Sequence, residues 1–213
     1  LGGMERISDT RIRVAAGVSM ARAAVFAANL SLGGLEFAHG IPGSIGGGVY
    51  MNAGAYGGEI AGVCESVDVM DYCGNVRTLS AAEMNFSYRH SCLEEQPAIV
   101  VSAVFALTSK PVEEIKAQMA DLMQRRRASQ PLDYPSAGSA FKRPVGGYAA
   151  ALIDQAGLKG FRVGGAAVSE KHAGFVVNLG SATANDVKEL LHRVAQIVCE
   201  RSGIQLEPEV RIW

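Results

Sequence analysis

The first third of the chain carries a pattern of polar and apolar positions that predicts both strand and helix. Arginine and aliphatic side chains alternate over residues 11–16, the period of two that a strand with one exposed face produces. Ser19 precedes a run in which alanine and valine recur at helical spacing, so we expect it to be the N-cap of a helix. That helix is predicted to end near Gly33-Gly34, since glycine commonly follows a last helical turn.

Three more strands are predicted before residue 110. They cover residues 65–71, 76–79 and 98–107, where apolar and polar side chains alternate. The segment DYCGN, residues 71–75, separates the first two strands and has the composition of a hairpin turn. A long glycine-rich loop lies between the helix and these strands.

The second half of the chain predicts helices with short strands between them. A helix over residues 112–127 has acidic residues in its first turn and arginines in its last, which suits the helix dipole and requires no ligand. The other predicted elements are a loop or linker at 129–138, a helix at 147–157, and strands at 162–168, 174–179 and 209–212.

One helix in this half has a continuous apolar stripe. Thr183 or Asn185 is expected to cap its start, and Gly203 to end it. The residues of the stripe are Val187, Leu190, Leu191, Val194, Ile197 and Val198.

Together these elements predict an α+β fold of two units. The composition changes at Ser109-Lys110-Pro111, so we place a first domain at residues 1–108 and a smaller one at 109–213.

Composition and charge exclude several classes of function. The formal net charge is −1, from 20 basic and 21 acidic residues, so no general field favours nucleic acid or anionic lipid. The apolar runs break before the roughly 18 residues that a membrane helix needs. No basic and apolar targeting segment opens the printed sequence, which favours a cytoplasmic location.

The cysteines point away from a metal site. They form no C-x-x-C pair and have no histidine nearby at ligand spacing, so we predict no metal and read them as reduced, inactive thiols. The four are Cys64, Cys73, Cys92 and Cys199.

Glycine is concentrated in one segment, because residues 33–62 hold 11 of the 25 glycines. Glycine costs backbone entropy on folding, so a segment this rich in it often has a ligand close to its backbone. Tight turns between short strands are the alternative. The common nucleotide motifs, G-x-x-x-x-G-K-[ST] and G-x-G-x-x-G, are absent here.

Longer motifs distinguish the two readings. GIPGSIGGG at residues 40–48 and MNAGAYGGE at 51–59 are followed by YRHS at 88–91, GSAFKRP at 138–144 and LEPEVR at 206–211. This series resembles the UDP-N-acetylenolpyruvoylglucosamine reductases, a bacterial cell-wall family of flavoproteins, over essentially the whole chain.

The resemblance implies FAD as cofactor and NADPH as co-substrate. Members of the family begin with a further FAD-binding subdomain, so the chain is expected to be the later portion of a reductase of the short form, which lacks an inserted tyrosine-bearing loop. The implied cofactor-binding residues are Ile41, Pro42, Gly43, Ser44, Ile45, Gly46, Gly47, Asn52, Ala53, Gly54 and Ala55.

The implied reaction is reduction of an enolpyruvyl ether on UDP-N-acetylglucosamine to the lactyl ether of UDP-N-acetylmuramate, for peptidoglycan synthesis. Hydride addition leaves negative charge beside the substrate carboxylate, which calls for a cation and a proton donor. The resemblance assigns these roles to Arg89 and Ser139, with Glu209 as a third catalytic group. From the residues alone, Arg89 suits a surface ion pair, Ser139 a turn, and Glu209 a pair with Arg211.

Tyr88, Lys142, Arg143 and His172 are candidates for substrate binding. The two basic residues follow Ser139 closely enough to hold a diphosphate, although an asparagine is common in the family at the position of Arg143. His172 suits a structural histidine equally well.

Two other functions remain open at this point. Besides the reductase, the chain could be a flavin-free fragment that binds UDP-sugar without activity. A different FAD oxidase on the same scaffold is the third possibility. The expected partner is a small UDP-sugar, with no nucleic acid and no membrane, and the sequence leaves the oligomeric state open.

Overall fold

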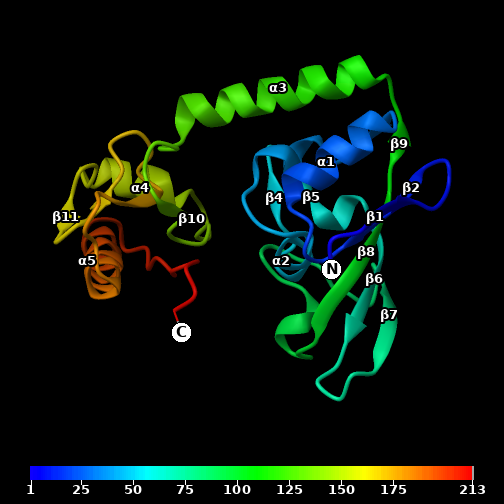
Figure 1. Cartoon of the computed structure of the whole chain (residues 1–213). Coiled ribbons are helices and arrows are strands. Elements are labelled where there is room, and N and C mark those ends of the chain that lie inside the picture. Colours follow the sequence, from blue (N-terminus) through cyan, green and yellow to red (C-terminus); the bar gives the residue numbers. More distant parts are fainter. Residues whose placement is uncertain (213) are drawn as a thin grey trace. The chain divides into compact units, whose positions relative to one another are not determined.

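The computed structural model describes residues 1–212, which form two compact units, residues 1–125 and the rest of the chain from Arg126 (Figure 1). The division lies within helix α3, Val112–Ser129. From the sequence, we placed the boundary between the FAD-binding and substrate-binding domains earlier, between residues 108 and 109. That boundary stays a prediction.

The first unit is built on a five-stranded antiparallel sheet. Neighbouring strands follow the order β1-β2-β8-β6-β7 (Figure 1). Their bounds are Met4–Arg6 for β1, Arg11–Ala15 for β2, Cys64–Met70 for β6, Val76–Ser80 for β7 and Ile99–Ala106 for β8. The predicted alternation in β2 is confirmed, because Ile12 and Val14 are fully buried while Arg11 and Arg13 are exposed.

Helix α1, Met20–Asn29, is capped as predicted, with Ser19 Oγ accepting from the backbone N–H of Arg22 at 3.3 Å. Its buried face is mostly alanine, and small side chains allow a helix to approach its neighbours closely. The same core includes the inward residues of β2 and β8, so the helix is held by burial of this face.

The hairpin between β6 and β7 is confirmed. Asp71 closes its turn, because Oδ1 accepts from the N–H groups of Cys73 and Asn75, both at 2.9 Å. Two carboxylate-accepted bonds stabilise the turn without help from the core.

The glycine-rich segment, predicted as a loop, contains short ordered elements. Helix α2 covers Ile45–Tyr50, and Ser44 caps it by accepting from the N–H of Gly47. The remaining short elements of this unit are β3 Leu32–Gly33, η1 Glu36–Gly40, β4 Gly54–Ala55, β5 Gly58–Glu59, η2 Ile60–Gly62, η3 Cys92–Glu94 and β9 Thr108–Ser109.

The second unit is a four-stranded antiparallel sheet with two helices. The strand order is β10-β13-β12-β11. The bounds are Ser136–Ser139 for β10, Ala149–Gln155 for α4, Arg162–Val163 for β11, Ala166–Val168 for β12, Phe175–Asn178 for β13 and Ala184–Ser202 for α5.

Helix α5 resolves which residue caps it. Thr183 Oγ1 accepts from the N–H of Asp186, and Asp186 Oδ2 accepts in return from the N–H of Thr183, so the cap is Thr183 and not Asn185. Gly203 ends the helix in the left-handed conformation, at φ 72°. Its apolar stripe forms the centre of the second core, where Leu190, Val194 and Val198 are fully buried.

Two predictions in this unit are wrong. Strand β10 begins inside the predicted linker at 129–138 and extends past it to Ser139, which pairs with Phe175 of β13. The final strand at 209–212 does not form among the described residues; instead a single bridge joins Phe141 to Pro208. Proline has no N–H to donate, which limits how far a ladder extends through it.

Within residues 1–212, no helix combines the length and the apolar character required to cross a bilayer.

Candidate functional site

Several glycines of the segment at residues 40–62 are required by close packing within the protein. A Cβ on Gly46 would lie 3.0 Å from Ala16 Cβ, and one on Gly54 would lie 2.7 Å from the carbonyl oxygen of Gly58. A Cβ on Gly58 would meet the ring of Phe37 at 2.6 Å. These three glycines therefore need no ligand to explain them.

Gly43 and Gly47 are different, because they leave exposed backbone with open space beside it. Nothing lies within 4 Å of a Cβ built on Gly43, which has φ 131°, and a Cβ on Gly47 would make only ordinary contact with Ser44 Oγ at 3.6 Å. A flat ring can approach such a surface closely. This backbone is therefore a candidate surface for the cofactor ring.

The N–H groups of this helix start are occupied within the protein. Ile45 donates to the carbonyl oxygen of Val18 at 2.8 Å and Gly46 to that of Ala16 at 2.9 Å. Ile45 also has a fully buried side chain. Contacts of these two residues with a cofactor would therefore involve other atoms than those N–H groups.

Among the remaining cofactor candidates, Asn52 has its side chain turned to internal partners. It is 1% exposed; Nδ2 donates to the carbonyl oxygen of Ser87 at 3.0 Å and to Glu59 Oε2 at 3.2 Å, and Oδ1 accepts from the N–H of Ala61 at 2.9 Å. Each of the other candidates stays a predicted contact: Ile41, Pro42 and Ser44 before α2, and Ala53, Gly54 and Ala55 after it.

Arg89 lies in a two-residue turn. The N–H groups of Ser87 and His90 each donate to the other residue's carbonyl oxygen at 3.2 Å, which leaves Tyr88 and Arg89 at the centre. Arg89 has φ 55°, in the left-handed region that non-glycine residues seldom adopt. Its guanidinium carbon lies 5.2 Å from the centre of the Tyr88 ring.

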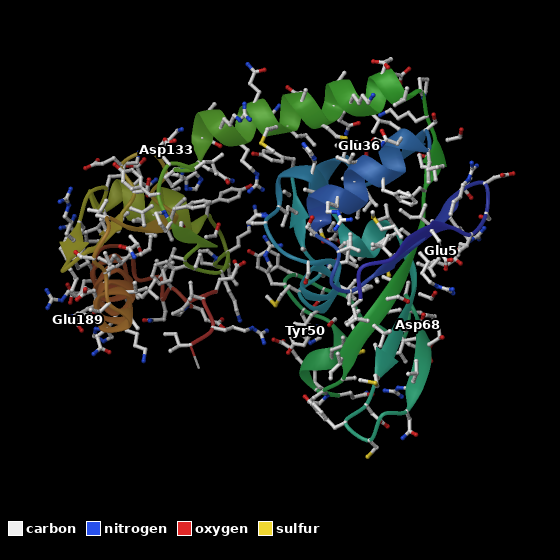
Figure 2. The ribbon with its side chains drawn as sticks, viewed as in Figure 1. Glu5, Glu36, Tyr50, Asp68, Asp133 and Glu189 are labelled. Carbon is white, nitrogen blue, oxygen red and sulfur yellow. The ribbon has the colours of Figure 1, made fainter. Side chains whose placement is uncertain are left out.

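Ser91 connects this turn to the glycine-rich segment. It is fully buried, and its Oγ donates to the carbonyl oxygen of Tyr50 at 2.7 Å; Figure 2 labels Tyr50. The motif at 88–91 therefore lies against the end of α2.

His90 forms an ion pair with Glu95 beside the turn. Glu95 Oε1 accepts a hydrogen bond from His90 Nε2 at 2.7 Å, which raises the pKa of His90, and the same contact lowers the pKa of Glu95. Glu94 lies 3.9 Å from the same nitrogen. These three residues are the group with metal-ligand chemistry among residues 1–212, and the ion pair accounts for their proximity.

In the second unit, the backbone brings Ser139 and Glu209 to neighbouring segments. The N–H of Glu209 donates to the carbonyl oxygen of Ala140 at 2.9 Å, and the N–H of Lys142 donates to that of Glu207 at 2.8 Å. Ser139 is exposed and follows Gly138, whose φ is 88°. The two backbone bonds therefore join the motif at 138–144 to the motif at 206–211.

The substrate-binding candidates of this unit have internal contacts. Lys142 Nζ pairs with Glu207, and the Arg143 guanidinium lies 4.0 Å above the ring of Tyr148. His172 Nδ1 accepts from the N–H of Gly174 at 3.1 Å, and burial lowers the pKa of His172. The geometry around His172 fits the structural alternative, and its role in binding stays a prediction.

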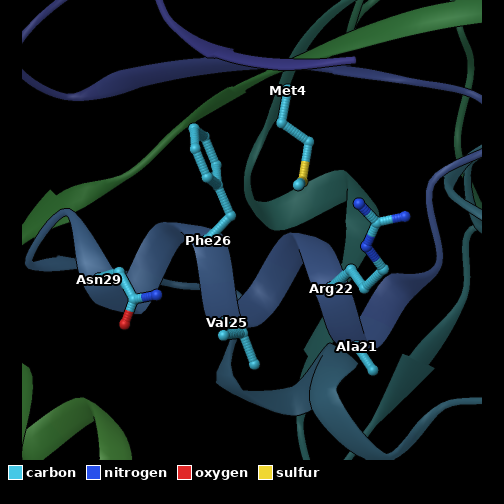
Figure 3. Close-up of a pocket in the computed structure, with 6 residues that line it drawn as sticks. All are labelled: Met4, Ala21, Arg22, Val25, Phe26 and Asn29. Carbon is cyan, nitrogen blue, oxygen red and sulfur yellow. The ribbon is translucent and has the colours of Figure 1, made fainter. Parts of the chain in front are cut away.

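Sequence reasoning did not find an apolar pocket on α1, of about 330 Å³ (Figure 3). Met4 reaches it from β1 and the other side chains come from one face of the helix. Its lining residues are Met4, Ala21, Arg22, Val25, Phe26 and Asn29. The half-exposed Val25 marks this pocket in the structure, and the helical pattern of the sequence did not separate Val25 from the buried apolar positions.

Arg89 belongs to the first unit, and Ser139 and Glu209 to the second. The structure joins the last two through their backbones and joins Arg89 to the glycine-rich segment. That all three meet over one ring stays a prediction.

The sequence matches two family models. Residues 1–80 match the FAD binding domain, and residues 130–213 match the C-terminal domain of UDP-N-acetylenolpyruvoylglucosamine reductase. These matches agree with the expected FAD-binding part followed by a distinct C-terminal part.

Relatives and a solved structure carry the same description. A UDP-N-acetylenolpyruvoylglucosamine reductase of Levilactobacillus brevis is 54% identical over 85% of this chain and 60% of its own length. One from Caldanaerobacter subterraneus is 50% identical over 97% of this chain and 68% of its own length. The crystal structure of the Thermus caldophilus reductase matches 94% of this chain and 72% of its own, with a TM-score of 0.83 and 42% identity. The chain thus spans about 60% to 72% of the lengths of these proteins.

Proposed function

The chain belongs to the UDP-N-acetylenolpyruvoylglucosamine reductase family, and from this membership we propose that it reduces UDP-N-acetylglucosamine enolpyruvate to UDP-N-acetylmuramate, with FAD as cofactor and NADPH as electron donor. The reaction belongs to peptidoglycan precursor synthesis. The partner is a small UDP-sugar, and the proposed location is the cytoplasm.

The described residues fit FAD at the glycine-rich segment. Gly43 and Gly47 have no Cβ, and the space that a Cβ would occupy is open. An aromatic ring can therefore approach the backbone at these two residues closely. When bound, FAD supplies a hydride, from N5 of its ring, for the terminal carbon of the enolpyruvyl double bond.

Arg89 is the proposed cation for the substrate. Its two-pronged guanidinium binds a carboxylate through parallel hydrogen bonds, and these strengthen as hydride addition spreads negative charge onto that group. The left-handed backbone at Arg89 supports this role, since strained residues collect at functional sites where the surroundings hold them in place.

Ser139 is the proposed proton donor to the carbon that bears the carboxylate. A serine hydroxyl is a weak acid, so a neighbouring group has to orient it. The observation that carries the assignment is the backbone bond from Glu209 to Ala140, because it brings a carboxyl group to the strand next to Ser139. We assign Glu209 to orienting the hydroxyl or a water molecule at that place.

Substrate binding is proposed for Tyr88, Lys142, Arg143 and His172. Tyr88 is 53% exposed beside Arg89, and Lys142 is two residues after Ala140. The basic side chains of Lys142 and Arg143 suit a diphosphate, the most highly charged part of the substrate.

Two measurements test the proposal. The FAD-loaded protein is mixed with NADPH, and the flavin absorbance is followed until it bleaches; the enolpyruvyl substrate is then added without oxygen. Recovery of the absorbance with formation of the lactyl ether is expected, and absence of recovery contradicts the proposed activity. Colourless protein whose melting temperature rises with the UDP-sugar would instead support a binding function without FAD.

A further inference from the structure

The turn that carries Arg89 needs support from outside itself. Its two reciprocal backbone bonds between Ser87 and His90 are both 3.2 Å, at the long end of the usual range. Arg89 has φ 55°, which costs free energy for any residue with a Cβ. A strained turn with long bonds keeps one conformation only if neighbouring groups restrain it.

Asn52 supplies such a restraint at one end of the turn. Its Nδ2 donates at 3.0 Å to the carbonyl oxygen of Ser87, the same oxygen that accepts from the N–H of His90. The other hydrogen of Nδ2 goes to Glu59, and Oδ1 accepts from the N–H of Ala61. Since the side chain is 1% exposed, these bonds face little competition from water.

The backbone of Asn52 explains why asparagine occupies this position. Its φ is 42°, and asparagine tolerates the left-handed region better than most residues with a side chain. Aspartate has the same shape and a similar tolerance, but it has no hydrogen to donate to Ser87. The two residues therefore differ at one feature that matters here, the donor.

Ser91 provides a second restraint at the other end of the turn, through its 2.7 Å bond to the Tyr50 carbonyl oxygen. The segment 50–52 thus holds both ends of the turn. This segment joins α2 to β4, within the part of the chain assigned to FAD.

We propose that Asn52 is a positioning residue for Arg89: it fixes the turn against the glycine-rich segment, so that the guanidinium has one orientation when substrate arrives. The inference rests on the proposed function, since it takes Arg89 to be the cation of the reaction. It assigns the side chain of Asn52 to the turn and leaves only its backbone available to FAD.

The test compares Asn52→Asp with the control Asn85→Asp. Asn85 is also left-handed, at φ 46°, and is exposed. In Asn52→Asp we expect substrate-dependent reoxidation of the flavin to slow by about 10²-fold, the effect of displacing a reacting group by about 1 Å. Reduction by NADPH, which does not use Arg89, is expected to change far less. Asn85→Asp should leave both steps near those of the unmodified protein.

Hydrogen exchange gives a readout that needs no activity. Amide exchange at residues 87–91 should be faster in Asn52→Asp than in the unmodified protein, with the core of β8 unchanged, whether or not FAD is present. Unchanged exchange at the turn would overturn the proposal. If Asn52→Asp folds poorly, Asn52→Gly takes its place, because glycine accepts the same backbone conformation.

A double variant distinguishes the bond from Asn52 to the Arg89 turn from the bond between Asn52 and Glu59. Asn52→Asp with Glu59→Gln restores a hydrogen bond between positions 52 and 59 without a donor to Ser87. Reoxidation should stay slow in this protein, and its recovery would overturn the proposal. Arg89→Lys tests the proposed function separately: if that variant reoxidises normally, the role of Arg89 is wrong whatever Asn52 does.

Discussion

The backbone N–H of Glu209 donates to the carbonyl oxygen of Ala140 at 2.9 Å, which ties the last motif of the chain to the residue after Ser139. The bond fixes the backbones and leaves the Ser139 hydroxyl exposed. An accessible hydroxyl next to a fixed backbone suits proton transfer to a bound molecule.

Ser139→Ala should therefore affect one half of the reaction. Bleaching of the flavin by NADPH should proceed at the normal rate, and its reoxidation by the enolpyruvyl substrate should fall by about 10²–10⁴-fold, the usual contribution of a general acid. Stopped-flow absorbance measures both steps. Ser181→Ala, an exposed serine of the same unit, is the control, and equal rates of reoxidation in the two variants would remove Ser139 from the mechanism.

Adjacent glycines of α2 should respond oppositely to alanine. Gly46→Ala is expected to lose about 1–3 kcal/mol of unfolding free energy, because the new Cβ meets Ala16 at 3.0 Å. Gly47→Ala should be neutral or gain up to about 0.5–1 kcal/mol, since its nearest contact is at 3.6 Å. Denaturant unfolding measures both.

Measuring the affinity for FAD distinguishes a glycine needed for packing, Gly46, from one proposed to contact the cofactor, Gly47. Gly47→Ala should bind FAD more weakly although it is as stable as the unmodified protein, because the new methyl group stands on the surface proposed for the ring. Equilibrium titration of the apoprotein with FAD measures this. Unchanged affinity in Gly47→Ala would move the proposed ring site away from Gly47.

The pKa of His90 should fall when its partner is neutralised. Glu95→Gln removes the 2.7 Å charged hydrogen bond that raises this pKa above 6.5, and Glu94→Gln, at 3.9 Å, should have a smaller effect. Because the contact raises the pKa of folded His90 and lowers that of folded Glu95, its stabilisation is complete only between the unfolded-state pKa values of the two groups. It is lost as pH rises through the folded-state pKa of His90 and as pH falls through that of Glu95. NMR titration of the ring measures the shift, and identical pKa values in both variants would contradict the assignment.

The thiols should differ in reactivity. Burial raises the pKa of Cys64 to about 12 and also raises that of Cys92, whereas Cys73 is exposed in the hairpin turn. At pH 8 an aromatic disulfide reagent should modify Cys73 first, and Cys64 and Cys92 only after unfolding. Peptide mass mapping identifies the modified residue; early labelling of Cys64 would show that the start of β6 opens.

Thr183→Ala should cost about 1 kcal/mol, since it removes the N-cap of α5. Asn185→Ala is the control inside the first turn and should change stability by a few tenths of that value. Equal losses in thermal unfolding would mean that the reciprocal bonds with Asp186 contribute little.

Local pattern was sufficient where local preference and tertiary packing agree. The alternation in β2 and the apolar stripe of α5 each coincide with a buried face, and Ser19 and Gly203 act as the caps their types suggest. Helix α2 could not be predicted this way, because glycine disfavours helix and its presence at position 46 depends on contact with Ala16.

The site shows the same limit. Motifs predicted that Arg89 and Ser139 matter, but no pattern indicated that Asn52 binds the carbonyl oxygen of Ser87. That contact joins segments far apart in the sequence and depends on the complete fold. The same holds for β10, whose small residues pair because β13 offers an edge.

Arg89 holds a conformation that its own type disfavours, and this has a consequence for protein engineering. Selection of variants for heat resistance alone rewards glycine or asparagine at position 89, because both relax the backbone at φ 55°. If Arg89 is the cation proposed for the reaction, such a screen would discard the guanidinium and collect well-folded molecules that lack the proposed activity. A selection that also requires turnover keeps the arginine and pushes the improvements elsewhere in the chain.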